Sequence, residues 1–86
     1  MDIIISDHAL FESKRRRIPL ELIESVARSP QQVIIMPAGR KICQSKFKDV
    51  SSDKTMLCRV VVIDSNNTRF VITAYITSKM DKYWEV

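Results

Sequence analysis

The residue pattern of this chain changes once, from helical spacing in about the first thirty residues to strand-like spacing in the rest. Two segments, residues 7–16 and 19–29, have helical character, and the second lies between Pro19 and Pro30. The later segment 57–63 is β-branched and apolar on both faces, as expected of a central strand. Helices followed by consecutive strands predict an α+β domain, in which an N-terminal helical hairpin packs on a four-stranded antiparallel sheet.

The first helix has clear end signals. Ser6 or Asp7 is a suitable N-cap, and the cations of residues 14–17 suit the negative end of the helix dipole. Ala9 and Leu10 are expected to face the core. Residues 2–5 are either a short strand or an apolar segment that leads into this helix.

The expected strands are residues 32–36, 40–47, 57–63 and 70–76, followed by a short C-terminal helical turn. A two-residue turn at 66–67 would set Arg59 against Ala74, whereas a loop one residue longer would set it against Tyr75. The polar loop at 48–54, if centred on residues 50–51, would place Cys43 opposite Cys58. Both cysteines are expected to stay reduced in a cytosolic protein.

Composition excludes several classes of protein. Gly39 is the only glycine, which argues against a Gly-rich phosphate loop. His8 is the only histidine and there are two cysteines, so neither a metal nor another cofactor is expected. No fully apolar run approaches the length of a membrane span, and no signal peptide is apparent, so a single cytoplasmic domain over residues 1–86 is expected. The net charge of +4 favours an anionic partner, either RNA or an acidic protein.

The strongest functional signal lies near the C-terminus. Here the last strand ends in a cluster of hydroxyl and cationic side chains, namely Tyr75, Thr77, Ser78, Lys79 and Lys82. A phenol near an ammonium can stabilise charge that develops on a phosphate. The alternative is a structural strand end in which Ser78 caps a last turn. Tyr83 and Trp84 are more typical of a hydrophobic latch than of a base-stacking platform.

Arg59 interrupts an otherwise apolar strand, so it is either paired with a carboxylate or presented to an anion at the sheet surface. His8 is either a general acid or base, or a histidine that bonds locally at the helix start. The run of cations at 14–17 is either a solvated helix end or a contact for phosphates or an acidic partner.

Several short motifs together resemble a family of small bacterial domains of unknown function related to BrnT-type toxins of the RelE/ParE superfamily. They are Ser6-x-His8-Ala9, Arg16-x-Ile18, Gly39-Arg40, Arg59-Val-Val and Thr73-x-Tyr75-x-Thr77-Ser78-Lys79-x-x-Lys82-Tyr83-Trp84. The resemblance implies a RelE/BrnT-like α+β fold and a toxin, paired with a small acidic antitoxin, that cleaves RNA. It implies His8, Arg59, Tyr75 and Lys79 as catalytic residues. The chain departs from the pattern at Glu12, where such families commonly have arginine.

The leading hypothesis is a metal-independent endoribonuclease, free or on the ribosome, in which the 2′-hydroxyl of RNA attacks the adjacent phosphate. His8 or Tyr75 would move protons, while Arg59 and Lys79 hold the phosphate. Further RNA contacts are expected from Arg16, Arg40, Thr77, Ser78 and Lys82. The alternative is a non-catalytic module of the same fold that docks on an antitoxin, a ribosome or a topoisomerase, which the Glu12 departure favours.

Overall fold

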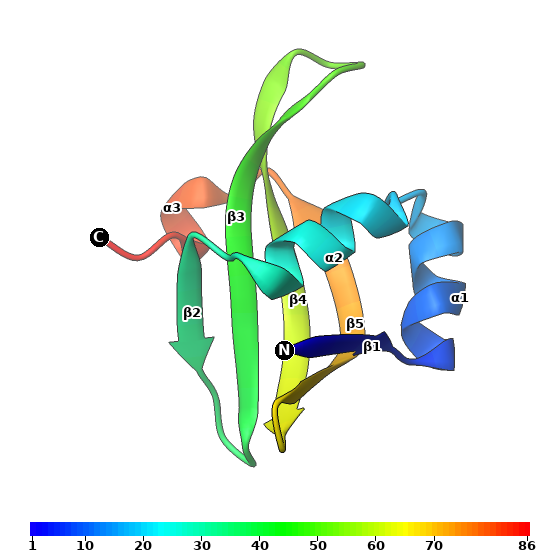
Figure 1. Cartoon of the computed structure of the whole chain (residues 1–86). Helices are drawn as coiled ribbons and strands as arrows, with labels where there is room; N and C mark the ends of the chain where they lie inside the picture. The colour runs from blue at the N-terminus through cyan, green and yellow to red at the C-terminus, as the bar shows by residue number, and fades with distance from the viewer.

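The computed structural model describes residues 1–86 and contains one five-stranded mixed sheet and three helices (Figure 1). The strands are β1 (Asp2–Ile5), β2 (Gln32–Ile35), β3 (Arg40–Asp49), β4 (Lys54–Ser65) and β5 (Thr68–Thr77). The helices are α1 (Asp7–Arg16), α2 (Leu20–Arg28) and α3 (Met80–Tyr83). The sheet order is β1-β5-β4-β3-β2, with β1 parallel to β5 and the other pairs antiparallel. The α+β class is confirmed, and the predicted four-stranded antiparallel sheet is corrected to five mixed strands.

The additional strand is β1, which the sequence left open as a strand or a lead-in. It pairs with the first half of β5, where Ile5 lies opposite Val71. Ile3 and Ile5 also pack against the hydrophobic core. After β1 ends, Ser6 donates its backbone N–H to the Val71 carbonyl and its hydroxyl to the Ile72 carbonyl. The chain therefore stays bound to the edge of β5 as it enters α1.

The two long helices do not form the predicted hairpin. Helix α1 packs along β5, whereas α2 crosses β3 and β4 (Figure 1). Ser6 caps α1 by accepting the Ala9 N–H, as predicted, and Arg17 ends it in the left-handed conformation at φ 57°. The buried side of α1 faces β5, so Ala9 is buried while Leu10, which was expected in the core, is 37% exposed.

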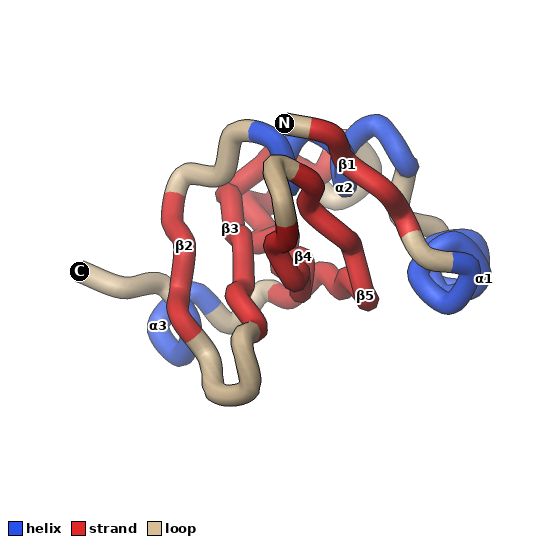
Figure 2. Tube along the Cα trace, turned by 60° about the horizontal axis from the view of Figure 1, so that its bottom comes forward, coloured by secondary structure: helices blue, strands red, loops and turns tan.

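The hydrophobic core lies between α2 and one face of the sheet, here called the core face. Helix α2 contributes Ile23, Val26 and Ala27, and the alternate positions Cys58, Val60 and Val62 of β4 lie opposite them. Fully burying one such aliphatic side chain stabilises the fold by about 1.5–3 kcal/mol. The opposite side of the sheet is called the outer face. Figure 2 shows α3 and α2 on opposite sides of the sheet, so the outer face is covered only by the C-terminal segment.

The β4–β5 hairpin combines two features that the sequence predicts as alternatives. Asn66 and Asn67 form a two-residue turn with φ values of 49° and 61°. The register then shifts by one residue between Val61 and Val62, which leaves Ile72 as an extra residue in β5. Because this bulge absorbs one residue, Arg59 lies opposite Tyr75 in spite of the short turn. The prediction that a two-residue turn sets Arg59 against Ala74 is therefore wrong.

The other hairpin, β3–β4, is longer than predicted, and its strands extend to Asp49 and Lys54. Its register places Cys43 opposite Val60, and Cys58 opposite Ser45. The expected pairing of the two cysteines is wrong because the loop is centred one residue later than assumed. Both thiols are free and buried, and burial raises the pKa of Cys58 to about 12.

None of the three helices has the length and apolar composition that a membrane-spanning helix requires.

Candidate functional site

A row of polar side chains crosses the middle of the outer face. Neighbouring strands contribute Gln32, Gln44, Arg59 and Tyr75, each opposite the next in the sheet register. Arg59 donates from Nε to the Gln44 Oε1 atom at 2.8 Å and from Nη1 to the Tyr75 hydroxyl at 2.5 Å. Two of the four predicted catalytic residues, Arg59 and Tyr75, therefore lie in direct contact.

The guanidinium of Arg59 has no counter-ion. Only 6% of the residue is exposed, yet no carboxylate lies within salt-bridge distance of it. Every fully buried side-chain nitrogen or oxygen has a hydrogen-bond partner, but Nη2 of Arg59 has none in the protein. This nitrogen must therefore reach solvent. A fixed cation with one free donor pair is suited to binding an anion such as phosphate.

Tyr83 completes the surroundings of Arg59. The guanidinium carbon lies 4.1 Å from the Tyr83 ring centroid and 5.7 Å from that of Tyr75. The two rings meet edge to face at 6.4 Å. The nearby Lys82 ammonium is the main cause that lowers the pKa of Tyr83, and the Tyr75 hydroxyl and the Arg59 charge act in the same direction. Two phenol rings thus flank one cation.

Glutamine side chains hold the C-terminal segment in this position. Gln44 is fully buried and donates from Nε2 to the Tyr83 carbonyl at 3.0 Å and to the Gln32 side chain at 2.7 Å. The Gln32 amide also exchanges two hydrogen bonds with the backbone of Glu85. The Lys46 ammonium lies 4.1 Å from the Trp84 ring centroid. Tyr83 and Trp84 therefore bind the chain end to the outer face.

The other C-terminal candidates lie beside this row and are not joined to it by side-chain contacts. Thr77 accepts the Lys79 N–H through its hydroxyl, so Thr77 and not Ser78 satisfies the backbone at this turn. Lys79 begins α3 as its N-cap residue without a side-chain capping bond. Ser78, Lys79 and Lys82 are exposed, and no contact joins Lys79 to Arg59.

The α1 candidate Arg16 is engaged in holding the sheet edge. Its Nη1 donates to the Ala74 carbonyl at 2.7 Å, and its Nη2 lies 3.2 Å from the Glu12 carboxylate. Glu12 also binds Arg15 at 2.5 Å, and this contact is the main cause that lowers the Glu12 pKa. Glu12 therefore neutralises arginines of its own helix.

His8 and Arg40 stand apart from Arg59. His8 is exposed in the first turn of α1 and makes no side-chain hydrogen bond. Its catalytic role stays a prediction. Arg40 is exposed at the start of β3 and shares the outer face with Gln44, four residues further along the strand. At about 3.3 Å per residue, this separation is about 13 Å.

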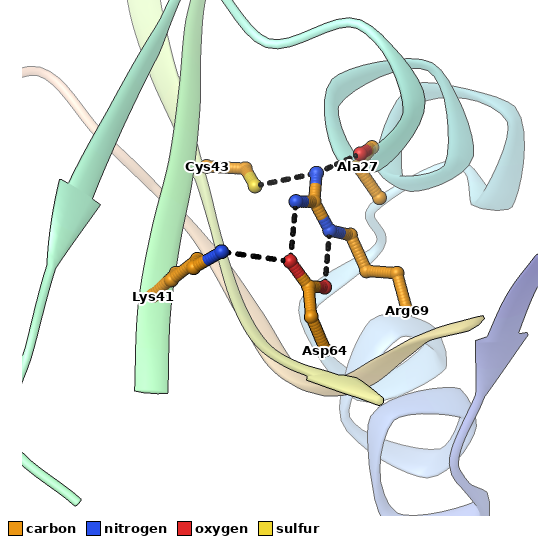
Figure 3. A network of polar contacts seen from close by, with 5 residues as sticks. All are labelled: Ala27, Lys41, Cys43, Asp64 and Arg69. Carbon is orange, nitrogen blue, oxygen red and sulfur yellow. Dashed lines mark hydrogen bonds and ion pairs between the residues drawn. The ribbon is translucent and has the colours of Figure 1, made fainter. Parts of the chain in front are cut away.

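A second buried arginine, Arg69, was not predicted as a site residue and lies on the core face (Figure 3). Arg69 binds both carboxylate oxygens of Asp64 at 2.7 Å and donates to the Ala27 carbonyl of α2 at 2.8 Å. Lys41 reaches the same carboxylate at 3.0 Å. Hydrogen bonds from Arg69, followed by Lys41, lower the pKa of Asp64 to about 2. Asp64 and Arg69 are placed symmetrically around the Asn66–Asn67 turn, and this spacing could have predicted that they pair.

No group of three His, Cys, Asp or Glu side chains is placed to hold a metal ion. Gln32 and Gln44, which organise the site, were also missed, because an isolated glutamine in a strand gives no signal of burial.

Comparison with known families gives one match, over residues 5–76, to a family described as a domain of unknown function, DUF4258. The match spans most of the chain, so the chain belongs to this family. It includes Arg59 and Tyr75 and ends before α3. No curated protein and no solved structure matches the chain.

Proposed function

We propose that this member of the DUF4258 family is a metal-independent endoribonuclease and the toxin of a toxin–antitoxin module. The observation that carries the proposal is Arg59, a buried cation with no carboxylate partner and with one nitrogen open to solvent. Buried charges in proteins are usually paired, and a bound phosphate would supply the counter-charge that Arg59 lacks. RNA is the phosphate-bearing substrate whose own 2′-hydroxyl can act as the nucleophile.

In the proposed reaction, the 2′-oxygen bonds to phosphorus and the bond from phosphorus to the 5′-oxygen breaks. The products are a 2′,3′-cyclic phosphate and a 5′-hydroxyl. Arg59 stabilises the charge that accumulates on the phosphate oxygens. Tyr83 acts in its phenolate form, which its lowered pKa favours, and accepts the 2′-hydroxyl proton, while Tyr75 donates its proton to the departing 5′-oxygen.

The hydrogen bond between Arg59 and Tyr75 fits this division of roles. The tyrosine oxygen accepts from Nη1, which leaves the phenolic proton free to point away from the arginine. Lys79 and Lys82 lie on the adjacent turn and supply further positive charge for RNA.

The test is cleavage of single-stranded RNA by purified protein, followed by analysis of the product ends. Tyr75→Phe keeps the ring and removes only the hydroxyl, and Arg59→Lys keeps the charge and removes the forked donors. We expect each to lower the cleavage rate by about 10²-fold or more. Lys54→Ala is the control, because this exposed lysine lies at the end of the β3–β4 hairpin and alternates to the other face of the sheet from Arg59. Cleavage that persists in Tyr75→Phe and Arg59→Lys would overturn the assignment.

A non-catalytic module that docks on an antitoxin, a ribosome or a topoisomerase is the second candidate. It is favoured by the Glu12 pairing, which occupies arginines of α1 that would otherwise be free for RNA. Controlled expression separates the two functions. Growth arrest with decay of total RNA supports the nuclease, whereas arrest with intact RNA supports docking. A neighbouring gene for a small acidic protein would favour the toxin–antitoxin assignment in either case.

A further inference from the structure

The outer face is covered over only part of its area. The C-terminal segment contacts Gln32, Gln44, Lys46 and Arg59, which lie toward one end of the sheet. Toward the other end, the register sets Ile4, Phe70 and Ile63 side by side on β1, β5 and β4. Ile4 is 48% exposed and Phe70 is 40% exposed. An apolar area with one aromatic ring therefore continues from the Arg59 site along the same face.

On the outer face, all charged side chains from β2, β3, β4 and β5 are positively charged. By strand alternation, β3 and β4 direct Arg40, Lys46, Lys48 and Arg59 to it, and none of β2, β3, β4 or β5 adds an acidic residue. The core face is mixed, because Lys41 and Arg69 meet Asp64 there. On β1, Asp2 is the one acidic strand residue of this face, so the apolar area is bordered mainly by cations and suits a polyanion that also has apolar faces. Two copies of the chain would bring like charges together if they paired through it.

We propose that this face binds single-stranded RNA, with one unpaired base stacked on Phe70 while the phosphate of a nearby nucleotide lies at Arg59. This inference rests on the proposed function and names its substrate class. Four residues of β4 separate Arg59 from Ile63, which is opposite Phe70, so the two contacts are about 13 Å apart. A strand a few nucleotides long can span that distance.

The choice of single strands over duplex follows from what the surface offers. Stacking on Phe70 requires a base whose flat face is free, and in a duplex the neighbouring pairs cover that face. Ile4 and Ile63 lie on either side of Phe70 in the sheet register and extend the apolar surface around its ring. Stacking is also tolerant of base identity, so the platform would add affinity with little sequence preference.

The test is binding of a fluorescently labelled single-stranded RNA, with the duplex of the same sequence as comparison. Tyr75→Phe serves as the background, so that the RNA remains intact. On this background we expect Phe70→Leu to weaken single-strand binding about tenfold, because base–aromatic stacking contributes about 1–3 kcal/mol. Phe70→Trp should retain the affinity. Phe11→Leu is the matched control, since Phe11 is a more exposed phenylalanine on α1.

Equal affinity of Phe70→Leu and its background, or equal affinity for duplex and single strand, would overturn the platform. If Arg59→Lys lowers binding in that case, the phosphate site stands and only the platform fails. If neither substitution matters, the proposed function fails as well. Crosslinking of RNA containing 4-thiouridine gives a measurement without substitution. The platform predicts adducts on Phe70 in the tryptic peptide of residues 70–79, and adducts confined to other peptides would contradict it.

Discussion

Two arginines are almost equally buried, yet their surroundings differ in kind. Arg59 is 6% exposed and Arg69 is 8% exposed, and they lie on opposite faces of adjacent strands. Arg69 is neutralised by Asp64 and tied to α2, whereas Arg59 contacts only neutral groups. Burial alone therefore does not indicate the role of a charged residue. The presence or absence of a counter-charge separates the structural arginine from the candidate functional one.

Removing the structural arginine should have the largest effect. Arg69→Met leaves the Asp64 carboxylate with Lys41 alone and removes the bond to the Ala27 carbonyl. We expect the free energy of unfolding, measured by urea denaturation, to fall by about 3–5 kcal/mol. The double variant Asp64→Asn/Arg69→Met should recover part of this loss, because no unpaired carboxylate remains. A loss below about 1 kcal/mol in Arg69→Met would contradict the structural role.

The next effect concerns the support of the functional arginine. Gln44→Leu removes the acceptor for Arg59 Nε and the donor to the Tyr83 carbonyl, and we expect destabilisation of about 1–3 kcal/mol. Trp84, the only tryptophan, reports the accompanying release of the C-terminal segment. Its fluorescence emission should move to longer wavelength in Gln44→Leu. An unchanged spectrum would show that the segment is held by other contacts.

Low pH should affect the two arginine networks differently, because only the Arg69 network contains a carboxylate. The pKa of Asp64 is about 2 in the folded protein against an ordinary value of 3.8. A lowered pKa stabilises the fold above the ordinary value, and this contribution is lost as the pH falls from about 3.8 toward 2. The difference corresponds to about 2 kcal/mol. Urea denaturation at pH 7 and pH 2.5 should show this loss in the wild type, and a smaller one in Asp64→Asn.

The smallest effect on stability is expected at the functional arginine itself. Arg59→Met relieves the cost of an unneutralised buried charge but leaves the Gln44 oxygen without its donor. These effects oppose each other, so the unfolding free energy should change by about 1 kcal/mol or less. Inorganic phosphate should raise the melting temperature of the wild type and not that of Arg59→Met. The proposed difference between Arg59 and Arg69 would be contradicted if Arg59→Met were strongly destabilised. It would also be contradicted if phosphate raised the melting temperatures of Arg59→Met and the wild type equally.

The sequence was most informative where the interactions are local. The bounds of α1 followed from the Ser6 cap and its arginine-rich end, and the Asn66–Asn67 turn followed from the tolerance of asparagine for positive φ. Strand β1 could not be assigned, because its partner strand lies more than sixty residues away in the chain. Arg59 was identified as a candidate from its place in an apolar strand. Its lack of a counter-ion depends on long-range packing, which no local pattern contains.

The bulge at Ile72 has a consequence for insertions and deletions in this family. The bulge contains one residue more than the register requires. A deletion at Ile72 would therefore turn the bulge into regular strand and leave Tyr75 opposite Arg59. A deletion of two residues between Val71 and Tyr75 would instead set Tyr75 opposite Val60 and turn its phenol toward the core. The face on which the phenol lies is therefore decided by the number of residues between Val71 and Tyr75. Relatives that have a different number of residues in this segment would therefore keep or lose the pairing of the tyrosine with the arginine.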